Sequence, residues 1–381
     1  MPSAYILFSG FWRYLKGIFL TLNKPFHKTN TAINGMIAGS ILLILTILLI
    51  VIALLFAVLA PIVIHLPQFG KAPKGDRLER ICQSPNYRKG QFHNIGDVQM
   101  HISFKTFFKS IHQMIFGQKK ALVPSEPLTM VHRDLKHLSP DHDYFVWFGH
   151  SSYLLSLHGT TILVDPTFCG GAPFLFVNKP FPGTDAYQPE ELPDHIDCLL
   201  ITHDHYDHLD YKSFLRLRSK VRQIVCPLGV GAHLERWGAD ANRIVEMDWG
   251  EEHHLTEGWQ IHCLPSQHFS GRALKRNNTL WASFLIDSPY GRIFAGCDGG
   301  YGSHFKEIGK QFAPIDLAIL ENGQYNEEWH TIHTMPDELG IEAVDLGAQR
   351  VITVHHSKFA LARHAWDEPL HNEQRAREEY G

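Results

Sequence analysis

One stretch of this chain limits its possible folds more than any other. Residues 35–64 contain no charged side chain and are rich in Leu and Ile. About 20 apolar residues are enough for a helix to cross a bilayer, so this stretch predicts one transmembrane helix with length to spare for tilt. A buried core helix would be unusually long. A cleaved signal peptide would have a shorter apolar run that begins nearer the N-terminus.

The charges are distributed unevenly along the 381 residues. Residues 1–75 contain six basic and no acidic residues, which leaves 29 basic and 39 acidic residues in the remainder. This pattern indicates a cationic front that meets anionic lipid and an acidic body that lies in water. An acidic body without a basic stripe argues against nucleic acid as a partner. Lys24 and Lys28 precede the apolar stretch and Lys71 and Lys74 follow it, so the charges favour neither membrane orientation.

We expect four segments along the chain. Residues 1–34 form a basic N-terminal segment, 35–64 the transmembrane helix, 65–100 a polar linker rich in Gly, Pro and Arg, and 101–381 one hydrolase domain. Residues 101–120 have the apolar spacing of a basic amphipathic helix. Such a helix either packs on its own domain or lies in the lipid interface.

From residue 143 onward the pattern is that of closely spaced β-strands, with short apolar segments separated by Gly or Asp. Further strand-like runs follow at residues 196–202, 222–227, 259–265, 279–287, 291–297, 315–320 and 350–356. Helix-like stretches lie between them at residues 210–218, 230–237, 303–312 and 335–346. Strands first, and then mixed strands and helices, predict a two-sheet α/β arrangement rather than a simple βαβ winding.

Groups that can bind a metal are concentrated at the end of one apolar strand, in the run LLITHDHYDHLD. His203 and His205 alternate in extended chain, so their side chains point the same way and can share one metal. The turn that follows brings Asp207 and His208 towards a second metal. Imidazole nitrogen and carboxylate oxygen are ligands of Zn²⁺, and zinc with an open position lowers the pKa of bound water towards ~7. A histidine-rich surface turn is the alternative.

This run resembles the HxHxDH signature of the metallo-β-lactamase superfamily, and the match to the signature is complete. The resemblance implies an α/β fold, a four-layer αββα sandwich that here follows one transmembrane helix. It also implies two Zn²⁺ ions per chain and three further ligands, in order along the sequence. These are His268 in PSQHFSGR, Asp298 in FAGCDGGY as the bridging carboxylate, and His355 in VITVHHSKF, with His356 as the fallback.

The implied ligand sets divide these residues between the two ions. One zinc takes His203, His205 and His268, the other takes Asp207, His208 and His355, and Asp298 bridges them.

Other segments resemble one branch of this superfamily, which contains N-acyl-phosphatidylethanolamine phospholipase D and the ascorbate-phosphate lactonases. VWFGHSSYLL and TTILVDPTF match its opening strands, and this implies that Asp165 orients a ligand histidine. His150 either faces the site or holds its turn. HTMPDELG implies that His333 contacts phosphate or donates a proton, against the alternative of an exposed loop.

The implied activity is zinc-dependent hydrolysis at a membrane, in which hydroxide held between two metals attacks phosphorus or a carbonyl carbon. We expect a phospholipase D-like phosphodiesterase that cleaves N-acyl-phosphatidylethanolamine-type phospholipids, with Asp298, Asp207 and His333 as its catalytic residues. One alternative is a hydrolase of a soluble substrate such as a sugar-phosphate lactone. The other is a non-enzymatic membrane binding module.

An apolar loop follows the opening strands, at residues 168–183. Loops mostly face water, so the exposure of Phe168, Phe174 and Phe176 beside the metals would be unusual. These three side chains are candidates for a substrate-binding lip that receives acyl chains. The alternative is a loop that folds onto its own core.

Overall fold

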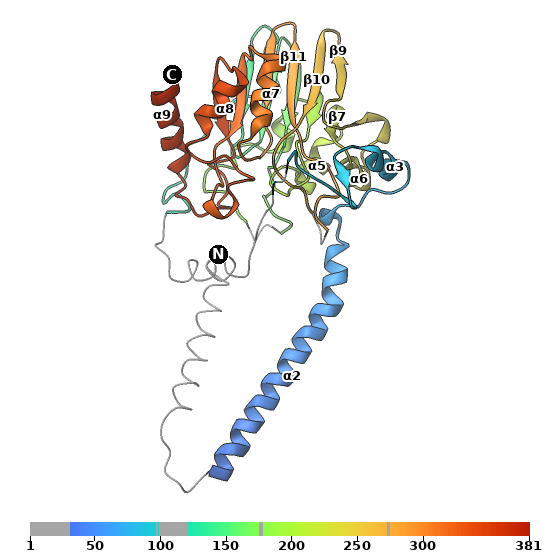
Figure 1. Cartoon of the computed structure of the whole chain (residues 1–381), viewed down its shortest axis with the longest axis vertical. Coiled ribbons are helices and arrows are strands. Elements are labelled where there is room, and N and C mark those ends of the chain that lie inside the picture. Colours follow the sequence, from blue (N-terminus) through green and yellow to red (C-terminus); the bar gives the residue numbers. More distant parts are fainter. Residues whose placement is uncertain (1–30, 97, 99–120, 175–177, 273–274) are drawn as a thin grey trace. The chain divides into compact units, whose positions relative to one another are not determined.

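The computed structural model describes residues 31–96, 98, 121–174, 178–272 and 275–381. The chain divides into two compact units, Met1–Leu66 and Pro67–Gly381 (Figure 1). Residues 1–30, the amphipathic stretch expected at 101–120 and the side chain of Phe176 lie outside the described residues.

The described part of the first unit is one long helix, α2 (Thr31–Ile64). Residues Ala38–Ile64 have a mean hydropathy of 3.5, and none of them is buried against protein. The hydroxyl of Thr46 donates to the carbonyl of Leu42 at 2.8 Å, so this polar group is satisfied inside the helix. Length and composition therefore make α2 a candidate membrane span.

The first sheet of the second unit has six strands in the order β3-β4-β5-β6-β7-β8. Its first three strands pair antiparallel, and β5 to β8 pair parallel. The strand bounds are Tyr144–Trp147, Tyr153–Leu157, Thr160–Val164, Ile196–Leu200, Val221–Pro227 and Ile244–Met247.

The second sheet also has six strands, in the order β14-β13-β12-β11-β10-β9. Here β9 to β12 pair antiparallel, and β12 to β14 pair parallel. The bounds of β9 to β14 are Glu252–Thr256, Trp259–Leu264, Ser283–Ser288, Gly291–Ala295, Leu317–Glu321 and Val351–Val354.

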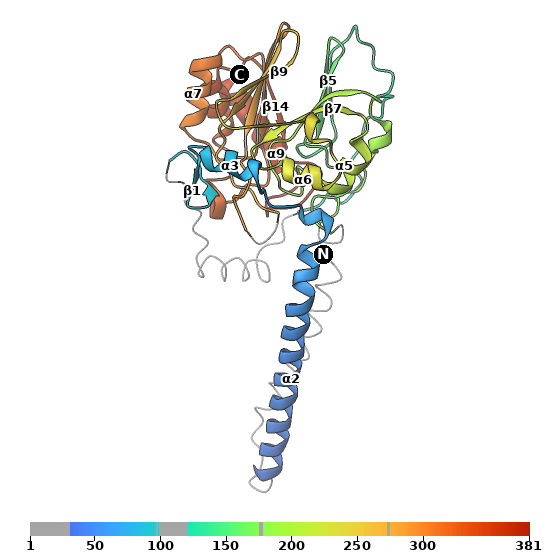
Figure 2. The same cartoon turned by 90° about the vertical axis from the view of Figure 1, so that its right-hand side faces the viewer.

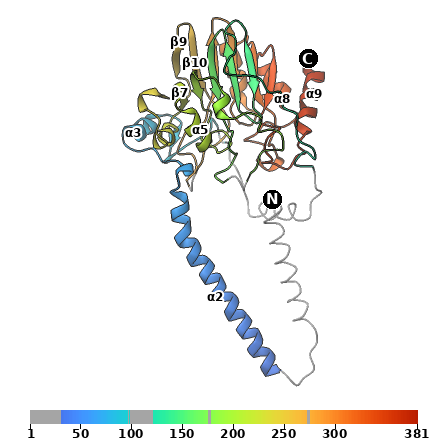
Figure 3. The same ribbon diagram turned by 180° about the vertical axis from the view of Figure 1, so that it is seen from behind.

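Helices cover the outer face of each sheet. The helix bounds are α3 Asp76–Gln83, α5 Tyr211–Leu217, α6 Gly231–Arg236, α7 Ser303–Phe312, α8 Leu339–Leu346 and α9 Glu368–Tyr380. Short 3₁₀ turns lie at η1 Pro67–Phe69, η2 Pro189–Glu191, η3 Ala241–Arg243 and η4 Glu327–Trp329. Helix α9 lies next to α8 at the side of the sandwich, as Figure 3 shows from behind.

Three buried clusters show how the layers are held together. One joins the first sheet to α5 and α6, for example Leu199 to Phe214 and Leu234. A second fills the space between the two sheets, and a third joins the second sheet to α7 and α8. Figure 2 shows the two sheets face to face, with α7 and α5 on opposite outer sides. The predicted αββα sandwich is therefore confirmed.

Residues 65–100 differ from the expected linker. From Pro67 onward they belong to the second unit, with α3 followed by a two-stranded hairpin, β1 (Tyr87–Arg88) and β2 (Gln91–Phe92). Ile81 and Phe92 are fully buried in a cluster with Trp281. A few apolar side chains in a mostly polar stretch are thus enough to fix this segment on the domain.

Candidate metal centre

The predicted site residues lie together because each follows a strand at the same end of the two sheets. Asp165 follows β5, His203 follows β6 and His268 follows β10. Asp298 follows β12, and His355 follows β14 directly. All five side chains are buried. Strand ends are rigid positions, so the sandwich holds these groups in a fixed geometry.

Three imidazole nitrogens form the first ligand group, from His203, His205 and His268. His205 Nδ1 lies 2.9 Å from His203 Nε2 and 3.3 Å from His268 Nε2. Zn–N bonds of about 2.0–2.1 Å in a tetrahedral site separate two ligand nitrogens by about 3.3 Å. The group therefore has the spacing that one metal ion requires.

The outer nitrogens of two of these rings determine their tautomers. The Thr202 hydroxyl donates to Asp165 at 2.6 Å, so it accepts from His203 Nδ1 at 3.0 Å. His268 Nδ1 donates to the carbonyl of Ile332 at 2.8 Å. Both rings therefore direct an Nε2 lone pair at His205, an arrangement that a cation between them would stabilise.

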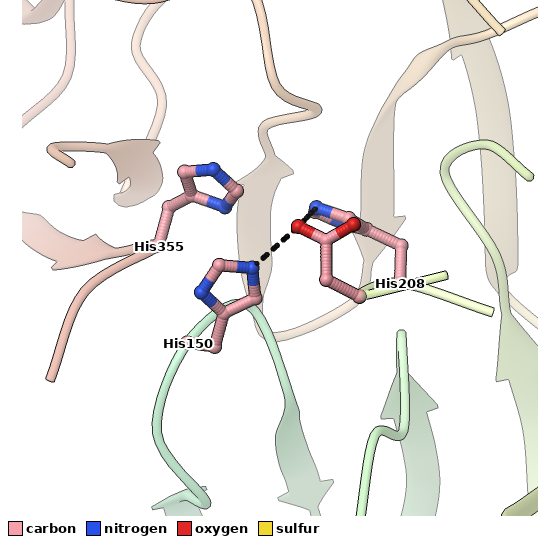
Figure 4. A group of neighbouring side chains, drawn as sticks. His150, His208 and His355 are labelled. Carbon is pink, nitrogen blue, oxygen red and sulfur yellow. Dashed lines mark hydrogen bonds and ion pairs between the residues drawn. The ribbon is translucent and has the colours of Figure 1, made fainter. Parts of the chain in front are cut away.

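A second ligand group contains His150, Asp207, His208 and His355, whose ligand atoms lie within 4.8 Å of one another (Figure 4). Asp207 Oδ2 lies 2.9 Å from His150 Nε2 and 3.7 Å from His208 Nε2. His208 Nδ1 donates to Asp165 at 2.8 Å, so its Nε2 carries the lone pair. This Nε2 faces the carboxylates of Asp207 and Asp298 at 3.7 and 3.0 Å. A lone pair that faces two carboxylates is stabilised by a cation between them, which fits a metal ligand.

Asp298 lies between the two groups. Its Oδ2 is 4.0 Å from both His203 Nε2 and His268 Nε2 and 3.0 Å from His208 Nε2. Its Oδ1 is 3.1 Å from His355 Nδ1. One carboxylate thus faces both ligand groups, as a bridging ligand must.

Three residues of the cluster have a left-handed backbone conformation, which is uncommon outside glycine. They are His150 (φ 54°), Asp165 (φ 41°) and His355 (φ 69°). His150 N donates to the carbonyl of His356 at 2.8 Å, and His355 N donates to the carbonyl of His150 at 3.0 Å. These two hydrogen bonds join the two sheets at the site and hold the strained turns in place.

The electrostatics of the cluster also suit a metal. Burial lowers the pKa of His203, His268 and His355, and neighbouring imidazoles lower it further. These rings are therefore neutral, as metal-ligating histidines must be. Burial also opposes a charge on His208, yet Asp298 and the other carboxylates around it raise its pKa well above the ordinary value. That excess of negative charge is what a bound dication neutralises.

The structure distinguishes the two candidate histidines after β14. His355 lies in the cluster, with its ring centroid 4.1 Å from that of His150. His356 instead contacts Thr353 Oγ1 through Nε2 at 3.2 Å, and its ring lies against Trp147. His355 is thus the residue placed to bind a metal.

His333 reaches the cluster from the loop between η4 and α8. Its ring centroid lies 5.1 Å from that of His268 and 5.6 Å from that of His355. Its Nδ1 makes a short hydrogen bond with Glu321 Oε1. This is not the exposed loop position that was its alternative, because the His333 side chain is only 13% exposed.

The apolar loop at 168–183 is divided between core and surface. Phe168 is 7% exposed and packs in the core, 5.1 Å from the ring of Phe148, so it does not form a lip. The physical reason is that its backbone is held by Ser213 Oγ at 2.8 Å, which directs the ring inward. Phe174 is half-buried against Phe69 and lines a cavity of about 440 Å³.

Sequence reasoning left two residues of the site unassigned. For His150 the sequence leaves two roles open, facing the site or holding its turn. The structure shows both, since its side chain contacts Asp207 and its backbone bonds to His355 and His356. Glu321 was not singled out, although an acidic residue at the end of the apolar run IDLAILE was a signal. A carboxylate that is 3% exposed at a strand end needs partners, and these are found only in the folded chain.

Comparison with known proteins identifies the family. Residues 160–356 match the beta-lactamase superfamily domain. An uncharacterized protein of Mycobacterium tuberculosis is 36% identical over 295 residues, which cover 76% of this chain and 78% of that protein. The N-acyl-phosphatidylethanolamine-hydrolyzing phospholipase D 1 of Caenorhabditis elegans is 32% identical over 268 residues, covering 66% and 73%.

A third relative is more similar over a shorter region. The outer membrane protein RomA of Klebsiella pneumoniae is 57% identical over 95 residues, which cover 25% of this chain and 72% of that protein. The matched domain, the two-sheet sandwich and the clustered His and Asp ligands agree with one another. The chain belongs to the beta-lactamase superfamily.

Proposed function

We propose that this chain, a metal-dependent hydrolase of the beta-lactamase superfamily, binds two Zn²⁺ ions and hydrolyses N-acyl-phosphatidylethanolamine-type phospholipids at a membrane. The observation that carries the proposal is the pair of His/Asp ligand groups with Asp298 between them. The substrate class rests on the similarity to the phospholipase D of C. elegans.

The donor set assigns ligands to both ions. His203, His205 and His268 would hold the first, Asp207, His208 and His355 would hold the second, and Asp298 would serve both. Bound zinc supplies a Lewis acid and a water molecule with a pKa near ~7. Imidazole and carboxylate ligands are those that zinc takes in hydrolytic sites.

The chain's own residues position the substrate around these ions. Asp298 is buried and Asp207 is partly buried, with 4% and 14% of their side chains exposed, and both carboxylates lie against ligand histidines. His333 lies at the edge of the cluster with Nδ1 already bonded, which leaves Nε2, when it carries a proton, to donate to a phosphate oxygen or to the leaving alcohol oxygen. Because these side chains are fixed around the bound cations, the site needs little reorganisation as the phosphodiester bond breaks.

A cavity of about 440 Å³ beside the HxHxDH motif supports a lipid substrate. Its wall combines the aromatic side chains of Phe174 and Tyr206 with the cations Lys179 and Lys212. Apolar rings suit acyl chains and lysines suit a phosphate. A larger cavity of about 750 Å³ lies against β14 and α9; none of the proposed metal ligands lines either cavity, but Tyr206 in the wall of the smaller one belongs to the HxHxDH motif.

Membrane action is supported by helix α2 and by the relative named as an outer membrane protein. We propose a single-pass membrane protein whose lipid substrate lies in the same bilayer. An anchored enzyme meets its lipid at high local concentration, because the linkage confines both to one surface.

The test is a mass-spectrometric assay of products from vesicles that contain N-acyl-phosphatidylethanolamine. The zinc-loaded full chain and its Asp298→Ala variant are incubated with the vesicles in parallel. We expect N-acylethanolamine and phosphatidic acid from the wild type alone. The same assay with metal removed by a chelator should give no product, and added Zn²⁺ should restore it.

Two other outcomes would change the conclusion. Turnover of a simple phosphodiester without cleavage of the vesicles would contradict the lipid substrate and favour a soluble one. No turnover of any ester by protein with two bound metals would contradict the hydrolase proposal as a whole.

A further inference from the structure

A buried carboxylate lies behind His333 and has no role in the ligand sets. Glu321 is the last residue of β13 and is 3% exposed. Its Oε2 accepts from the backbone N–H of Gly299 at 2.6 Å, and its Oε1 makes a short hydrogen bond with His333 Nδ1. A carboxylate buried this deeply is held in place by the donors that it accepts from.

These contacts connect a rigid element to a loop. Glu321 ends a strand that pairs with neighbours on both sides. His333 follows η4 on a segment without regular structure. A loop side chain keeps one orientation only when something outside the loop holds it. Glu321 supplies that contact, and Gly299 fixes the carboxylate itself next to Asp298.

The pairing leaves one free nitrogen on the imidazole. Nδ1 faces Glu321, and a ligand atom of His333 lies within 4.8 Å of those of Asp298 and His355. The His333 side chain is 13% exposed, whereas those of His203, His268 and His355 are at most 1% exposed; His205 is partly buried, like His333. His333 therefore borders the space that a substrate enters.

We propose that Glu321 is a positioning residue for the hydrolysis: it accepts from His333 Nδ1–H and so holds the ring with Nε2 towards the space that the substrate enters. The inference rests on the proposed function for its substrate and adds the residue through which His333 is aligned. It is the same use of a carboxylate behind a histidine that orients a general base in hydrolases.

A double-mutant cycle tests whether Glu321 acts through His333. The variants are Glu321→Gln, His333→Ala and the two combined, in the zinc-loaded full chain. Glutamine has the shape of glutamate but only one acceptor oxygen, so it cannot accept from both Gly299 and His333. We expect Glu321→Gln alone to lower kcat about 10- to 100-fold with KM changed less than about threefold. In the His333→Ala background it should have no further effect.

Glu342→Gln is the matched control. Glu342 is also a buried carboxylate near this loop, but it contacts the hydroxyl of Thr334 at 2.9 Å and not His333. Its variant should keep the wild-type kcat. Metal content is measured for every variant, and we expect two ions in each.

Three results would overturn the inference. One is an equal loss of kcat in both backgrounds, which would mean that Glu321 acts independently of His333. Another is wild-type kcat for Glu321→Gln. The third is loss of metal in that variant, which would assign Glu321 to the support of Asp298 instead.

A spectroscopic measurement keeps the inference testable if Glu321→Gln does not fold or the substrate is different. In ¹⁵N-histidine-labelled protein, an imidazole N–H bonded to a carboxylate gives a downfield proton resonance. We expect one such resonance to be lost in His333→Ala and retained in Glu342→Gln. Its absence from the wild type would refute the pairing, whereas a wild type that cleaves no phosphodiester would refute only the proposed function.

Discussion

Three of the ligand histidines are held from behind, each by a different kind of partner. His203 is fixed through Thr202, His208 through Asp165, and His268 through the backbone carbonyl of Ile332. Such contacts set the tautomer of a ligand ring and raise its basicity. The precision of this site therefore depends on residues that do not touch a metal.

Asp165 supports the site through three side-chain hydrogen bonds. Its Oδ2 accepts from His208 Nδ1 at 2.8 Å and from the Thr202 hydroxyl at 2.6 Å, and its Oδ1 accepts from Thr202 N at 2.8 Å. We predict that Asp165→Asn lowers zinc affinity or turnover about 10- to 100-fold, because an amide cannot accept from all three donors. Zinc titration with a competing chelator measures the affinity.

Asp197→Asn is its control. Asp197 accepts from the backbone N–H and hydroxyl of Thr161 at 2.9 and 3.1 Å, which repeats the contact of Asp165 with Thr202 at the other end of the same sheet. It contacts no ligand histidine. If both variants lost zinc to the same degree, the effect would be one of general stability and the role of Asp165 would be wrong.

Substitution of a proposed metal ligand should reduce turnover and zinc content more than substitution of a residue that only orients a ligand. We predict that His203→Ala and Asp298→Ala each reduce turnover to background and lower the number of bound zinc ions, while the far-ultraviolet circular dichroism stays that of the wild type. The fold should persist because the core clusters do not depend on the metal. Near-normal activity in either variant would show that the ligand assignment is incorrect.

At the scale of elements, regular strands were the part of the fold most open to prediction. The run 196–202 became β6, and residues 303–312 form α7 with the same bounds. Both have the apolar period of their element. Helix α9 was not predicted, since Glu368–Tyr380 is mostly polar and is helical through its contacts with α8. The segment from Pro67 is also mostly polar, so its sequence predicts a linker, although it packs on the second unit.

The residues of the candidate site also fall into a group that the sequence predicts and a group that only the fold brings together. His203, His205, Asp207 and His208 lie within six residues and could be predicted as a group from the sequence. His150 and Glu321 could not, because their partners are distant in the sequence and adjacent only in the fold. Phe168 was placed on a lip because loop residues are mostly exposed, but Ser213 ties it inward.

The layer between the two sheets should carry a large share of the stability. Phe284 on β11 is fully buried there. We predict that Phe284→Ala lowers the free energy of unfolding by about 3–5 kcal/mol, since the removed ring leaves a cavity between two rigid sheets. Val351→Ala, on the edge strand β14 with 37% exposure, should change it by less than about 0.5 kcal/mol. Urea unfolding followed by tryptophan fluorescence measures the free energy of unfolding of both variants. Similar losses in Phe284→Ala and Val351→Ala would contradict this assignment of the core.

At the scale of the whole molecule, the two units have opposite chemistry. One contains an uncharged helix whose apolar side chains are exposed, and the other contains all 39 acidic residues and a conventional buried core. An exposed apolar surface as long as α2 is unstable in water. We expect a bilayer around the candidate span, residues 38–64, to remove that cost.

A charged variant of α2 tests this placement. Ile50 and Leu54 lie at the middle of the helix, and arginine at each costs about 2.5–3.5 kcal/mol in a bilayer. Ile50→Arg with Leu54→Arg also divides the apolar stretch into residues 35–49 and 55–64, which are 15 and 10 residues long. Both are shorter than the roughly 17 residues that a spanning helix needs, so the helix cannot slide to an alternative position.

We therefore predict that the double arginine variant is lost from membranes washed with alkaline carbonate, whereas the wild type and an Ile50→Ala, Leu54→Ala control remain in the pellet. Zinc content should be the same in all three, because the ligands lie in the other unit. Equal retention of the arginine variant would mean that membrane attachment does not depend on α2. Loss of the alanine control would mean that side-chain packing, and not the absence of charge, holds the helix in the bilayer.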